Sequence, residues 1–128
     1  MEVKQATRTT INQVRAVKYL PIAIYYTPAG DWYVVPAHVV VAFVSRKERG
    51  QHTENPFESA TLNLATLARW RVAEPAELRS ATLAAIEASA RYPALKQAME
   101  QVRRRARTLA DESLADVRAL VHRLGIEP

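Results

Sequence analysis

The sequence predicts an α+β fold (α/β-like), a small mixed sheet with flanking helices, followed by a C-terminal helical segment of about three helices. Two observations lead to this class. The first part of the chain holds short β-branched and aromatic runs separated by turn residues. From Pro75 onward the composition changes to Ala, Leu, Arg and Glu at helical spacing. We therefore divide the 128 residues, which suit one small domain, into an α/β portion (1–73) and a helical segment (74–128).

The first elements follow from local patterns. Glu2–Gln5 alternates like the end of a strand. Thr10 and Gln13 fit a capping box, which predicts a helix from about Thr10 to Tyr19. Its apolar positions lie three residues apart, at Ile11, Val14 and Val17.

A hairpin and a helix are expected next. The turn residues Pro28–Asp31 separate two β-rich runs, Leu20–Tyr26 and Trp32–Val35. This pattern predicts two antiparallel strands. His38–Lys47 predicts a helix, although its three consecutive valines also allow a strand. Gly50–Pro56 is polar and predicts a loop. Phe57–Leu64 is compatible with a strand or a helix.

The helical segment shows three apolar faces. The first is predicted along Leu78, Thr82, Ala85 and Ser89, with Leu83 and Ile86 beside it, before Pro93 breaks the helix. The second follows Leu95, Ala98, Met99, Val102, Ala106 and Leu109. The third begins after Asp111 and follows Leu114, Val117, Leu120, Val121 and Leu124, and Gly125 ends it.

Composition limits the classes of function. The chain carries a net charge of +5 with a pI near 9.9, and the excess lies mainly in the first 50 residues. A basic balance favours polyanion partners such as DNA, and equally describes a solvated basic surface. The absence of cysteine excludes a thiolate zinc site and a cysteine nucleophile. No apolar run suits a membrane span, so we expect no membrane partner and a cytoplasmic protein.

Glu2 and Lys4 are the candidate catalytic residues. Two positions apart on a strand, their side chains point to the same face. A carboxylate there can hold Mg²⁺, which lowers the pKa of a bound water, and a lysine can neutralise charge on a phosphate. An isolated E-x-K is by default a surface ion pair, because so short a motif is frequent.

The order of the segments that follow this pair supports a catalytic interpretation of it. Glu2–Lys4 is followed by Asn12–Arg15, by Tyr19–Tyr26 and by Asp31–Pro36. This order resembles the PD-(D/E)XK nuclease superfamily, of the restriction-endonuclease-like and Holliday-junction-resolvase-like kind. The resemblance covers about the first third of the chain. It implies a metal-dependent DNA endonuclease that hydrolyses phosphodiester bonds, with Glu2 as a Mg²⁺ ligand, Lys4 assisting the water and Gln5 as a helper.

One feature departs from the superfamily pattern. That pattern has an acidic residue, usually Asp, on the strand before the E-x-K strand, and only Met1 precedes Glu2 here. We expect a sequence that lacks the N-terminal part of the core. If Met1 is the native start, the metal site is incomplete, and activity would need a partner chain or the protein is a remnant. If the start is a truncation, the intact protein would be an ordinary nuclease.

Basic residues supply candidate phosphate contacts. They are Arg8, Arg15, Lys18, Arg46, Lys47 and Arg49. The run Arg46–Arg49 also suits a solvated helix end, and His52 is a lone loop histidine with no expected role.

Two alternatives to the nuclease remain. One is a non-catalytic nucleic-acid-binding module. The other is a helical protein-interaction module that forms homo-oligomers through the C-terminal helices.

Overall fold

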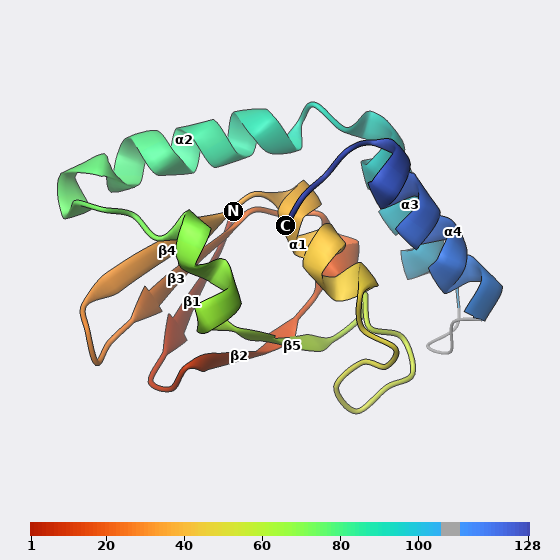
Figure 1. Ribbon diagram of the computed structural model, residues 1–128, viewed down its shortest axis with the longest axis horizontal. Coiled ribbons are helices and arrows are strands. Elements are labelled where there is room, and N and C mark those ends of the chain that lie inside the picture. Colours follow the sequence, from red (N-terminus) through yellow and green to blue (C-terminus); the bar gives the residue numbers. More distant parts are fainter. Residues whose placement is uncertain (106–110) are drawn as a thin grey trace.

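The computed structural model describes residues 1–105 and 111–128, and it confirms the α+β class (Figure 1). Strands β1 to β5 fill the first half of the chain, with helix α1 among them. Helices α2, α3 and α4 follow, as the sequence predicts. The strands are β1 (Glu2–Ala6), β2 (Thr10–Val14), β3 (Ile22–Tyr26), β4 (Asp31–Val35) and β5 (Ala60–Asn63). The α-helices are α1 (Ala37–Ser45), α2 (Leu78–Ser89), α3 (Pro93–Arg104) and α4 (Asp111–Arg123).

A three-stranded mixed sheet has the order β1-β3-β4. β1 runs parallel to β3, and β3 pairs with β4 as the predicted antiparallel hairpin. Tyr25 and Trp32 lie opposite each other in that hairpin with ring centroids 4.9 Å apart. The aromatic residues at strand spacing therefore include a cross-strand pair that stabilises the hairpin.

The predicted helix from Thr10 to Tyr19 is wrong. Residues Thr10–Val14 form β2, which pairs antiparallel with β5, and Ala16–Lys18 form one 3-10 turn, η1. The register shifts between Ile11 and Val14, where Gln13 has a φ of 56°. This bulge inserts an extra residue, so two inward-facing side chains stand three positions apart and imitate helical spacing.

The segment after β4 agrees with the prediction of a helix and then a loop. The predicted helix His38–Lys47 is α1, and Phe57–Leu64, left open by the sequence, contains strand β5. The 3-10 helices η2 (Leu64–Trp70) and η3 (Pro75–Glu77) then lead to α2.

Helices α3 and α4 bury the faces that the sequence predicts, and α2 buries Ala85 and Ser89 of its predicted face. α3 buries Leu95, Met99 and Val102, and α4 buries Leu114, Val117 and Val121. Ala106 and Leu109 lie outside the described residues. Leu83 and Ile86 of α2 are exposed. Among the described residues, no helix is long and apolar enough to cross a membrane.

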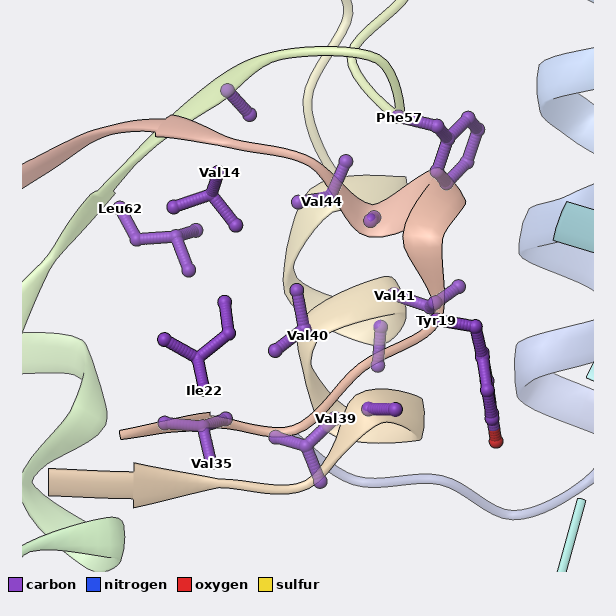
Figure 2. Packing of buried hydrophobic residues seen from close by; sticks show 14 of the residues in the cluster. Val14, Tyr19, Ile22, Val35, Val39, Val40, Val41, Val44, Phe57 and Leu62 are labelled. Carbon is purple, nitrogen blue, oxygen red and sulfur yellow. The ribbon is translucent and has the colours of Figure 1, made fainter. Parts of the chain in front are cut away.

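One buried cluster joins both halves of the chain. It contains side chains from β2, β3, β4, β5 and α1 together with those of α3 and α4. In Figure 2, Val14 and Leu62 extend from β2 and β5 towards Ile22 and Val35 of the other sheet, beside Val40 of α1. The two small sheets therefore form facing layers, closed on one side by α1.

Helix α2 covers the other face of the three-stranded sheet. Ala85 packs there with Ala23 and Val34. Near the end of α2, the buried hydroxyl of Tyr19 donates to the carbonyl of Ser89 at 2.8 Å. The C-terminal helices are thus fixed to the α/β portion through hydrogen bonds as well as apolar contacts.

Candidate functional site

Glu2 and Lys4 lie on one face of β1. The Lys4 Nζ is 3.2 Å from the Glu2 Oε1, and about a fifth of each side chain is exposed (19% and 23%, respectively). In the sheet register they align with Ile22 and Ile24, which are buried in the core. The pair therefore stands at the border of the space between the two sheets, with part of each charged group open to solvent.

A second contact fixes the lysine. The Lys4 Nζ also donates to the backbone carbonyl of Gln13 at 3.3 Å. Gln13 is the left-handed residue of the β2 bulge, and its N–H donates to the Gln51 side-chain oxygen at 2.8 Å. That same Gln51 oxygen accepts from the Thr61 hydroxyl at 3.3 Å. A chain of hydrogen bonds thus runs from the 50–59 loop through the bulge to Lys4.

Sequence reasoning did not identify Gln13 and Gln51 as site residues. A backbone carbonyl carries no signature in residue type, so Gln13 left no signal for this role. Gln51 stood in a polar loop, and only the fold brings its amide to a residue 38 positions away. Both residues act by positioning Lys4.

A polar hollow between β1 and β2, called the β1–β2 hollow, adjoins the pair. It has a volume of about 460 Å³ and is lined by Lys4 and Arg8 with neighbouring hydroxyl and amide side chains. The other lining residues are Gln5, Ala6, Thr7, Thr10, Ile11 and Asn12. Two cations, two hydroxyls and two amides, with no acidic side chain among the lining residues of the described chain, form a surface suited to an anion such as a phosphate.

The remaining predicted phosphate contacts are dispersed. The Arg15 Nε donates to the carbonyl of Glu58 at 3.3 Å, and Lys18 is exposed on η1. Arg46 lines a different hollow beside α4. Arg49 is exposed in the loop after α1. Lys47 is half-buried, and its carbonyl accepts from Arg118. Of the six candidates, Arg8 is the one that shares a hollow with Lys4.

Acidic and imidazole side chains are not clustered in the described part of the chain. Within residues 1–105 and 111–128, no group of three or more His, Cys, Asp or Glu side chains could hold a metal ion. Glu2 offers one carboxylate, and that carboxylate is paired with Lys4. The described residues therefore show no cluster of acidic ligands around Glu2 of the kind that the superfamily resemblance implies.

No family model, curated protein or solved structure matches this chain. The resemblance to the PD-(D/E)XK superfamily therefore rests on the order of its motifs alone.

Proposed function

We propose that this protein binds the DNA backbone at the β1–β2 hollow and carries the carboxylate–lysine half of a phosphodiester-hydrolysing site. The observation that carries the proposal is the placement of Lys4, which pairs with Glu2 and also lines the β1–β2 hollow. One ammonium group thus connects a surface suited to phosphate with a candidate catalytic carboxylate.

The residues have distinct parts in this proposal. Arg8 is exposed and free to reach a backbone phosphate by a charge-assisted hydrogen bond. Lys4 neutralises negative charge that develops on the phosphate under attack, and its contact with Gln13 holds the ammonium in place. Glu2 orients the ammonium through their ion pair, and it is the carboxylate available to a metal.

Binding is tested by fluorescence anisotropy with a labelled duplex over a range of salt concentrations. Lys4→Ala and Arg8→Ala should each weaken binding and lower the slope of log affinity against log salt by about one. Arg79→Ala is the matched control, because Arg79 is an exposed cation on α2 outside the hollow. Equal slopes for all three variants would contradict the assignment of the hollow to phosphate.

Hydrolysis is tested by relaxation of supercoiled plasmid in the presence of Mg²⁺. We expect Lys4→Ala and Glu2→Gln to lower the cleavage rate by about 100-fold or more, since each removes charge from the reacting centre. Arg79→Ala should cleave at the unaltered rate. Cleavage that survives Lys4→Ala would exclude the proposed site.

A purely binding protein is the second candidate function. It is favoured by the lack of a group of three metal-ligating side chains in the part of the chain that the structure describes. Salt-dependent binding through Lys4 and Arg8, without cleavage by the unaltered protein, would select this candidate.

A further inference from the structure

The outer edge of β1 has backbone groups available for another strand. The Glu2 N–H donates to the Pro21 carbonyl at 3.0 Å, and the Ala6 carbonyl accepts from the Thr27 N–H at 2.9 Å, both on the β3 side. Because these groups alternate along a strand, the N–H and C=O of Val3 and Gln5 point away from β3. β1 is the edge of its sheet, and the described residues place no strand beside it.

Some of the exposed apolar side chains lie on this edge or next to its start. The large hydrophobic residues that the described chain leaves exposed are Met1, Val3, Leu20, Leu83 and Ile86.

Pro21, just before β3, lies close to both Met1 and α2. The hydrogen bond from Glu2 to Pro21 places Met1 next to the segment that contains Leu20. Ile86 lines a hollow with Pro21, the residue whose carbonyl accepts from Glu2.

Val3 lies on the face of the sheet that α2 covers. It is paired in register with Ala23, which packs against Ala85 of α2, yet Val3 itself is 67% exposed. An unpaired strand edge bordered by exposed apolar groups is the arrangement expected of a protein interface.

We infer that β1 pairs with β1 of a second copy of this chain, antiparallel and centred on Val3. In this register the N–H and C=O of the two Val3 residues bond to each other. Glu2 of each copy then stands opposite Lys4 of the other copy, on one face of the joined sheet. Opposite charges in directly opposed positions stabilise an antiparallel pair.

The charges of β1 favour a second copy of this chain as the strand that pairs with its open edge. One negative and one positive residue flank Val3, so the strand is complementary to itself about that residue. A register centred on Lys4 would instead oppose two lysines and is disfavoured by like-charge repulsion.

Pairing would also change the candidate site, and this part of the inference rests on the proposed function. The Glu2 of the second copy would lie diagonally across from Glu2, at roughly 7–8 Å between their backbones. The two Glu2 carboxylates would then lie on one face of the joined sheet, on either side of the symmetry axis, and Mg²⁺ is commonly held by one or two carboxylates with phosphate oxygens. The second copy would thus supply one further carboxylate to a position shared by both chains.

The test measures mass by light scattering over a range of protein concentrations, without DNA or metal. The unaltered protein should reach twice the mass of one chain. Glu2→Lys opposes lysines and Lys4→Glu opposes glutamates, so each variant alone should need at least a tenfold higher concentration to associate. An equimolar mixture of the two variants should associate again, because every opposed pair is then of opposite charge. Glu100→Lys, an equal charge change on an exposed position of α3, should dimerise normally.

The backbone component is tested at Val3. Val3→Pro removes the N–H at the symmetry axis and should abolish association, whereas Val3→Ile should preserve it. Circular dichroism establishes that each variant is folded. A folded Val3→Pro variant that still dimerises would exclude the β1 edge as the interface.

Three results would overturn the inference. They are a monomer at every concentration, single charge variants that associate like the unaltered protein, and a mixture that fails to associate. A dimer that does not cleave DNA would count against the proposed hydrolysis alone. A monomer that cleaves DNA would count against the pairing alone.

Discussion

Replacing Gly50 with alanine should disturb the site from a distance. A Cβ at Gly50 would lie 2.5 Å from the Asn55 carbonyl oxygen and 2.6 Å from that of Ser59. These are backbone atoms, so the loop itself must shift. Gln51 would move with it, because its N–H donates to the Ser59 carbonyl at 2.7 Å. Its side chain would then lose the N–H of Gln13.

The magnitude follows from the crowding and the lost hydrogen bond. Forcing a methyl group into a filled space costs about 1–3 kcal/mol. The hydrogen bond between Gln51 and Gln13 accounts for about 0.5–1.5 kcal/mol within that range. At about 2.1 cal/mol/K per residue, the unfolding entropy of 128 residues is about 0.27 kcal/mol/K. The melting temperature should therefore fall by about 4–11 °C.

Thermal unfolding followed by circular dichroism measures this fall, and a second glycine supplies the control. Gly125→Ala adds a Cβ that meets no atom within 4 Å, although the φ of +70° makes it unfavourable by about 1–2 kcal/mol. Gln51→Ala should lower the melting temperature on the Gly125→Ala background and add little on the Gly50→Ala background, because the shifted loop has already released Gln51.

A Gly50→Ala variant that melts within about 1 °C of the unaltered protein would contradict the predicted shift of the loop. Equal effects of Gln51→Ala on both backgrounds would also refute it.

Two further predictions concern stability. Burial, and secondarily the charge of Arg91, lowers the pKa of His38 below 6.5, so the unfolded chain binds this proton more readily. The stabilising contribution of His38 should therefore be fully present above pH 6.5 and be lost as the pH falls below it. His38→Gln should flatten this dependence of the unfolding free energy on pH, measured by urea titrations at several pH values, and an unaltered dependence would contradict the prediction. The Arg118 guanidinium donates to two carbonyls at the end of α1, so Arg118→Ala should cost about 1.5–3 kcal/mol. A urea midpoint unchanged by Arg118→Ala would show that this contact does not hold α4 to α1.

Local sequence patterns were sufficient to predict those elements whose conformation depends mainly on their own residues. The β3–β4 hairpin followed from two β-rich runs around a Pro-Gly turn, and α3 and α4 followed from apolar stripes. The common face of Glu2 and Lys4 also follows from the period of a strand, which is a property of the backbone. Arg8 was a candidate from its charge alone, and the fold places it in the same hollow as Lys4.

Other features depended on residues distant in the sequence. β2 was mistaken for a helix because its bulge spaces Ile11 and Val14 three apart, and its partner β5 begins about fifty residues later. The proposed roles of Gln13 and Gln51 depend on that same long-range pairing, and neither residue type encodes it.

Short-range periodicity was enough to predict the class of fold, the hairpin, the C-terminal helices and the shared orientation of one carboxylate and one lysine. Long-range contacts, in contrast, make β1 a sheet edge, hold Lys4 against a bulged strand and bring Arg8 into the same hollow. Strand pairing and the contacts between layers join segments far apart in the chain, and no local pattern specifies which segments will meet.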